Sequence, residues 1–116
     1  MWSLRWGGET LEQIGLDESV PKEHRERACA LHAIYPSAEQ FKALMADEAV
    51  GLPAMLADRL AQTVSLLTDV QRSGLGSAKT QRAILFALRH YPDKSLIAFL
   101  TGDVSLAYWF RHEKFD

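Results

Sequence analysis

Apolar residues recur every three or four positions along most of the chain, which is the spacing of an amphipathic α-helix. No stretch shows the sustained alternation of apolar and polar residues that a half-buried strand requires. The pattern therefore predicts an all-α fold, a compact bundle of five to six helices. No linker or low-complexity tract divides residues 9–116, which we expect to form a single domain.

The first eight residues depart from this helical pattern. Trp2, Leu4 and Trp6 alternate with polar residues, and two glycines follow them. Alternation that ends in glycines is typical of extended backbone and a chain break. We therefore expect residues 1–8 to form a short extended arm.

Start and stop residues mark the helices that follow. Thr10 with Gln13, and Ser37 with Gln40, have the form of a capping box, and Asp93 is a further candidate N-cap. Prolines and glycines between the apolar stretches separate one helix from the next. A short helical turn is expected over residues 10–14, and the expected helices cover residues 21–35, 37–46, 53–72, 78–90, 93–100 and 103–114.

Two of these helices are expected at the centre of the bundle. The helix over residues 53–72 is the longest, and its apolar positions recur without an internal breaker. Residues 83–88 are six consecutive apolar residues, so the helix over 78–90 is apolar on all sides and is predicted to lie in the middle of the core.

The C-terminal segment is the first candidate for a functional site. Residues 95–114 resemble a helix–turn–helix, in which two helices meet at a turn glycine, here Gly102. Asp103 follows this glycine, where a buried aliphatic residue is usual. The resemblance implies a DNA-binding regulator whose nucleic-acid contacts come from Tyr108, Arg111, His112 and Lys114.

The glycine-rich segment 74–80 does not have the spacing of a phosphate-binding loop. Ser73 and Ala78 stand where that motif needs glycine, and a helix precedes the segment where a strand is needed. What remains is a helix N-terminus with Lys79 in its first turn, which either holds an anion or simply begins a helix.

Cys29 and His32 have a spacing that places two metal ligands on one side of a helix. Cys29 is the only cysteine, and no second ligand pair accompanies the two residues. We expect no metal and no cofactor. A lone cysteine also cannot form an internal disulfide, which favours a reducing compartment.

Signatures of catalysis are also missing from the sequence. The carboxylates fall mostly on predicted exposed faces, where nothing raises their pKa toward catalytic values. His90 and His112 would form an acid–base pair only if the fold brought them together. Catalysis is therefore the least favoured of three hypotheses, after protein binding and DNA binding.

Composition and charge narrow the class of protein further. Hydrophobic residues make up 47% and charged residues 24% of the chain, as in ordinary globular proteins. The net charge is −2, but residues 1–58 carry ten acidic and five basic side chains, and residues 59–116 carry five acidic and eight basic ones. An anionic partner for the second half is therefore compatible with the charge pattern. No apolar run reaches membrane-spanning length and no signal peptide begins the chain, so we expect a cytoplasmic protein.

Large aromatic side chains gather near both ends of the chain. They either pack together over the bundle or form a partner surface, where tryptophan and tyrosine are enriched. We expect a small non-enzymatic protein that binds another protein or forms a homodimer, in an adaptor or regulatory role. The residues predicted to contact the partner are Trp2, Leu4, Trp6, Tyr108 and Trp109.

Overall fold

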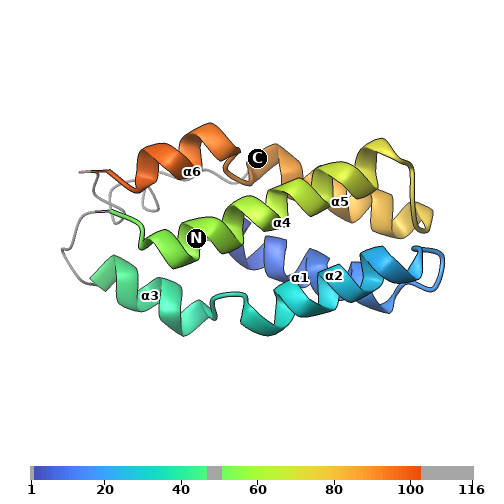
Figure 1. Cartoon of the computed structure of the whole chain (residues 1–116), viewed down its shortest axis with the longest axis horizontal. Helices are drawn as coiled ribbons and strands as arrows, with labels where there is room; N and C mark the ends of the chain where they lie inside the picture. Colours follow the sequence, from blue (N-terminus) through green and yellow to red (C-terminus); the bar gives the residue numbers. More distant parts are fainter. Residues whose placement is uncertain (1, 47–50, 103–116) are drawn as a thin grey trace.

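In the computed structural model, which describes residues 2–46 and 51–102, the chain folds into a bundle of helices (Figure 1). These described residues form no strand, so the prediction of an all-α bundle is confirmed. The helices are α1 (Trp2–Leu16), α2 (Lys22–Ile34), α3 (Ala38–Ala46), α4 (Ala54–Arg72), α5 (Ala78–His90) and α6 (Lys94–Leu100).

The predicted bounds of α2 to α6 agree with the structure to within one residue at each end. Ser37 and Gln40 form the expected capping box, in which the Ser37 N–H donates to the Gln40 side chain at 2.7 Å and the Gln40 N–H donates to the Ser37 hydroxyl at 3.1 Å. Ser77 and Asp93 likewise cap α5 and α6 through their side chains. The helix expected over 103–114 lies outside the described residues.

The N-terminal prediction is wrong. Residues 2–8 form no extended arm but the first half of α1, which continues to Leu16. The expected capping box at Thr10 is also absent, because Thr10 lies inside this helix and its hydroxyl donates to the carbonyl of Trp6 at 2.7 Å. The alternation of apolar residues near the N-terminus was therefore not a sign of extended backbone.

Two tyrosines explain why a helix passes through a pair of glycines. A Cβ atom on Gly7 would overlap the ring of Tyr91, and one on Gly8 would stand 2.8 Å from Cδ2 of Tyr35. The glycines therefore let two aromatic rings lie directly against the backbone of α1. Glycine lowers helix propensity, and here that cost is offset by close packing.

Helix α4 is the spine of the bundle, as predicted. It crosses the molecule diagonally in Figure 1 and contacts α1, α2, α5 and α6. Its buried side chains contribute to two hydrophobic clusters. The first cluster contains Leu4, Phe41, Leu52, Ala57, Leu60, Tyr91, Ile97 and Leu100. The second contains Leu11, Ile14, Val20, Ala28, Leu31, Leu66, Leu67, Val70, Ile84 and Ala87.

Helix α5 is less central than its apolar run predicts. Ile84 and Ala87 are buried, but Leu85 is 48% exposed. The helix buries one face against α1 and α4 and leaves the opposite face in solvent. None of the helices in residues 2–46 and 51–102 is both long enough and apolar enough to cross a bilayer.

Candidate functional site

The structure places the predicted partner-binding residues in different environments. Leu4 is only 1% exposed and belongs to the first hydrophobic cluster, so it cannot contact a partner while the protein is folded. Its role as a contact residue is therefore corrected to a core residue. The side chain of Trp2 lies outside the described part of the structure, as do Tyr108 and Trp109.

Trp6 packs within the molecule. Its ring lies 4.1 Å from the ring of Phe86 and 6.3 Å from the ring of His90, measured between centroids. Trp6 remains partly exposed, and a small cleft of about 200 Å³ opens beside it. These contacts show that the ring of Trp6 packs on α5; whether its exposed part also contacts a partner stays a prediction.

The predicted nucleic-acid contacts cannot be located in this structure. Tyr108, Arg111, His112 and Lys114 all lie outside the described residues. The possible acid–base pair of His90 and His112 is likewise untested, because His112 lies outside the described residues. The described part of the segment 95–114 is α6 without its first residue, followed by the turn at Thr101 and Gly102.

The N-terminus of α5, near Lys79, already carries an anion from the protein itself. The carboxylate of Asp17 accepts a hydrogen bond from the Ser77 N–H at 2.9 Å and another from the Thr80 hydroxyl at 2.5 Å. These hydrogen bonds, with one from the Ser19 N–H at 2.8 Å, hold the pKa of Asp17 well below its usual value. The anion that the sequence left open at this helix end is thus the side chain of Asp17, in the loop between α1 and α2.

Cys29 and His32 both lie against α1, next to residues three positions apart on that helix. Cys29 is exposed and lies beside Gly15, while Nε2 of His32 lies 3.3 Å from a carboxylate oxygen of Glu12 on α1. Within residues 2–46 and 51–102 no three histidine, cysteine or acidic side chains come close enough to hold a metal ion.

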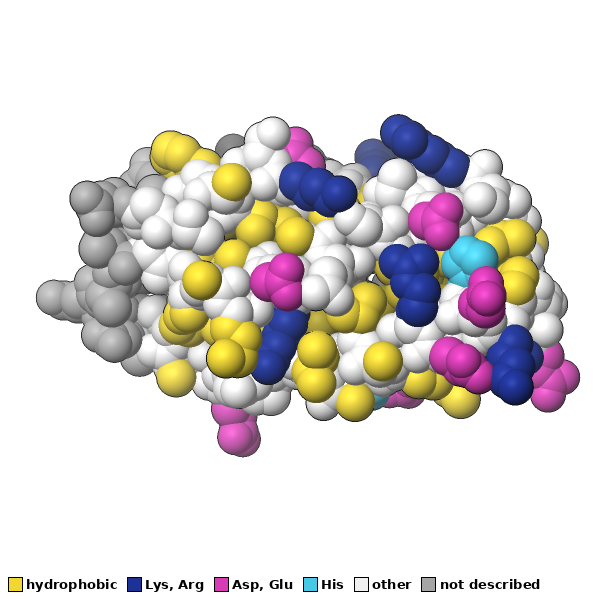
Figure 2. Space-filling model, viewed as in Figure 1, with side chains coloured by type: hydrophobic (Ala, Val, Ile, Leu, Met, Phe, Trp, Pro, Cys, Tyr) yellow, Lys and Arg dark blue, Asp and Glu magenta, His cyan; other side chains and the backbone are white. Residues whose placement is uncertain are grey.

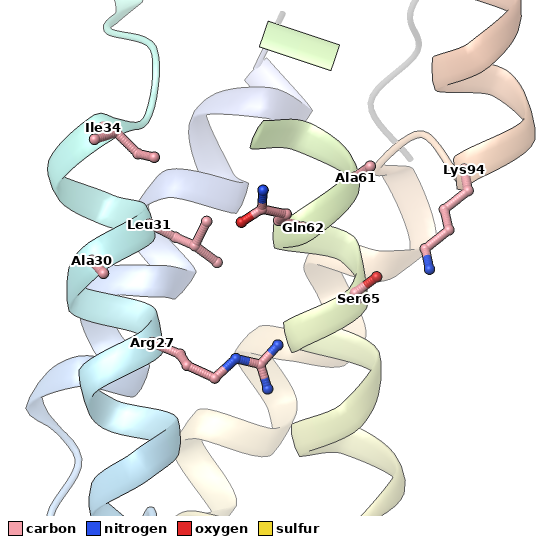
Figure 3. A pocket seen from close by; sticks show the side chains of 8 residues that line it. All are labelled: Arg27, Ala30, Leu31, Ile34, Ala61, Gln62, Ser65 and Lys94. Carbon is pink, nitrogen blue, oxygen red and sulfur yellow. The ribbon is translucent and has the colours of Figure 1, made fainter. Parts of the chain in front are cut away.

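An open groove between α2 and α4 is the candidate site that the tertiary structure reveals. Its volume is about 470 Å³, and we call it the α2–α4 groove (Figure 3). Helices α2 and α4 lie side by side and run in opposite directions (Figure 1). The residues that line the groove are Arg27, Ala30, Leu31, Ile34, Ala61, Gln62, Ser65 and Lys94.

The groove has an apolar surface flanked by two cations. Ile34 is 45% exposed there, although it is a large hydrophobic residue. Arg27 reaches from α2 toward α4, and Lys94 lies at the start of α6, across α4 from α2 (Figure 3). A second hollow of about 500 Å³ shares Ser65 and Lys94 with the groove and continues along α4 to Arg72.

Of the two cations at the groove, Arg27 forms an ion pair and Lys94 does not form one with any described residue. A guanidinium nitrogen of Arg27 lies 3.7 Å from the carboxylate of Asp69, which also interacts with Nε2 of His24 at 3.1 Å. Lys94 is exposed and has no ion-pair partner among the described residues. On the face shown in Figure 2, charged side chains gather over the end where α2 begins and α4 ends, and hydrophobic ones gather toward the other end.

Sequence reasoning missed this groove for an identifiable reason. The apolar face assigned to α2 contains Ala28, Leu31 and Tyr35, whereas Ala30 and Ile34 lie beside it. The sequence did contain a signal for the groove: the apolar face of α2 is wider than packing against one neighbouring helix requires. The α4 and α6 sides of the groove required the tertiary structure.

Comparison with known proteins adds no relative. No protein-family model, curated protein or solved structure matches this chain.

Proposed function

We propose that this protein acts without catalysis, by binding another protein in an adaptor or regulatory role, and that the α2–α4 groove is its contact surface. The observation that carries the proposal is the exposed apolar lining of the groove, in which Ile34 and Ala30 face solvent beside Ala61. Apolar surface flanked by polar residues is typical of protein contact sites.

The chemistry of the lining also favours binding over catalysis. Among the described residues that line the α2–α4 groove, Ser65 is the only one with a hydroxyl side chain, and none is a histidine or carboxylate that could act as its general base. The remaining polar groups there, on Gln62 and the two cations, can orient a partner through hydrogen bonds and charge.

Paired substitutions on α2 test the proposal. Ala30→Glu places a charge in the groove, whereas Ala33→Glu places the same charge at an exposed position of the same helix outside it. Each variant and the wild-type protein would be used to capture proteins from a lysate of the source cells, with quantification by mass spectrometry. We expect Ala30→Glu to reduce recovery of a specific partner by about tenfold or more, and Ala33→Glu to leave it unchanged.

Light scattering on the same variants asks whether the partner is a second copy of the chain. A dimer that Ala30→Glu dissociates and Ala33→Glu preserves would identify the groove as a self-association surface. If Ala30→Glu altered neither the captured proteins nor the solution mass, the groove would not be the contact surface.

A further inference from the structure

The shape of the α2–α4 groove suits one kind of occupant. Between Arg27 and Ile34 it follows about two turns of α2, or about 10 Å. The antiparallel neighbours α2 and α4 leave a valley between them, and the small side chains of Ala30 and Ala61 let a third helix approach closely. The described residues offer no strand edge on which an extended peptide could pair.

The charge of the groove further limits which kind of helix can bind there. Within residues 2–46 and 51–102, two cations and no carboxylate line the groove. Asp69, which pairs with Arg27, is outside the lining and is shared with His24. Lys94 is exposed and makes no ion pair within the described residues. A carboxylate on a partner would therefore find a cation at either side of the apolar surface.

We infer that the α2–α4 groove binds an amphipathic helix of a partner protein, with its apolar face against Ala30, Ile34 and Ala61 and with aspartate or glutamate at the flanking positions. This inference rests on the proposed protein-binding function and specifies the chemistry of the partner. Lys94 receives the partner's carboxylate, and Arg27 contributes a second cation at the other side of the groove.

A peptide-display selection tests this chemistry directly. The library consists of helical peptides of about 18 residues, with leucine at helical spacing and with glutamate, lysine, glutamine or alanine at every flanking position. Wild-type protein selects the binders, and the Ala30→Glu variant removes peptides that bind elsewhere. We expect glutamate to be enriched over lysine at flanking positions.

The best glutamate peptide is then measured against charge variants by fluorescence anisotropy. Lys94→Glu should raise its Kd by about tenfold, and replacement of its glutamates by lysine should do the same or more. The control Lys42→Glu makes the same charge change at an exposed position of α3 outside the groove and should leave Kd unchanged. Added salt should weaken the wild-type complex, because screening reduces the attraction between exposed charges.

Three results would overturn the inference, and they bear differently on the proposed function. Enrichment of neutral or lysine-rich peptides that Ala30→Glu excludes would leave the groove as a binding site but reject the acidic partner. Peptides that bind Ala30→Glu as well as the wild type would show that the helix docks elsewhere. If no peptide were enriched, a helical occupant would be rejected, and the lysate capture would decide the proposed function separately. Circular dichroism of each variant confirms that it is folded.

Discussion

At the scale of single residues, Asp17 shows how a loop side chain can complete a helix. The first N–H groups of a helix have no partner within it and favour negative charge. Ser77, the residue just before α5, caps this helix with its side chain. The carboxylate of Asp17, in a loop far away in the sequence, accepts hydrogen bonds from Ser77 and Thr80 at the same helix end. The two contacts fasten the loop between α1 and α2 to the start of α5.

The pKa shift of Asp17 predicts how the stability of the protein depends on pH. The pKa is lowered from its usual 3.8 in the folded state, so folding is favoured while the carboxylate is ionised. At neutral pH we expect Asp17→Asn to lower the free energy of unfolding by about 1 kcal/mol, because solvent weakens the charge at this partly exposed site. The difference from wild type should shrink as the pH falls below 3.8, since the unfolded state then takes up a proton that the folded state does not.

Urea unfolding followed by circular dichroism, at neutral and at acidic pH, measures this difference. Glu18→Gln is the matched control, because Glu18 is the exposed neighbour of Asp17 in the same loop. An equal effect of the two substitutions, or a difference that does not depend on pH, would contradict the assigned role of Asp17.

At the scale of elements, α1 shows how tertiary contacts can decide a helix against local preference. Its two adjacent glycines and alternating aromatic residues indicate an extended arm when the segment is read alone. The rings of Tyr35 and Tyr91 need close access to the backbone of α1, and glycine alone provides it. The Tyr35 hydroxyl also donates to the carbonyl of Leu4 at 2.5 Å, which fastens the same helix to the end of α2.

The fit of Gly7 against Tyr91 gives a second prediction. In an exposed helix Gly→Ala stabilises by about 1 kcal/mol through helix propensity. Here the added methyl group would overlap the ring of Tyr91 and stand 2.8 Å from the hydroxyl of Tyr35, so we expect Gly7→Ala to destabilise the protein by about 1–3 kcal/mol.

A double-mutant cycle with Tyr91→Ala separates packing from propensity. With the ring removed, Gly7→Ala should lose most of its cost, and the midpoint of thermal unfolding would report the coupling. If the destabilising effects of the two substitutions were additive, the cost of Gly7→Ala would not come from its contact with the ring of Tyr91.

At the scale of the whole molecule, the two tyrosines join parts of the chain that are far apart. Tyr35 packs against both hydrophobic clusters, and its hydroxyl lies 3.0 Å from that of Tyr91, a member of the first cluster. Burial raises the pKa of both hydroxyls above the usual value of 10.0. Ionisation of either tyrosine therefore opposes the packing that holds the two clusters together.

Alkaline titration tests this arrangement. A raised folded-state pKa means that the neutral tyrosines favour folding below pH 10.0 and that this contribution is lost as the pH rises above that value. We expect ultraviolet absorbance of tyrosinate from Tyr35 and Tyr91 to appear together with loss of helical circular dichroism. The variant Tyr35→Phe should unfold less steeply with rising pH, although it is less stable at neutral pH. If tyrosinate from both residues appeared while the helices remained intact, the hydroxyl pair would not be buried as described.

The sequence determined most of the helices by itself, because their signals are local. A proline or glycine breaks the chain within a few residues, and a side chain such as Ser37 or Asp93 caps a helix three residues away. Apolar spacing then predicts a buried face for each helix, and for α4 this was enough to predict the spine of the bundle. The bounds of α2 to α6 follow from such signals.

The tertiary structure decided what depends on residues far apart in the chain. The rings of Tyr35 and Tyr91, which follow α2 and α5, pack against the glycines of residues 2–8 and stabilise this segment as a helix. Asp17 contacts the start of α5 from a loop about 60 residues earlier in the chain. The α2–α4 groove depends on which faces of α2, α4 and α6 meet, and local apolar spacing does not specify that arrangement. The stability of the fold depends on all of its contacts together, so favourable packing can override the local conformational preference of a short segment.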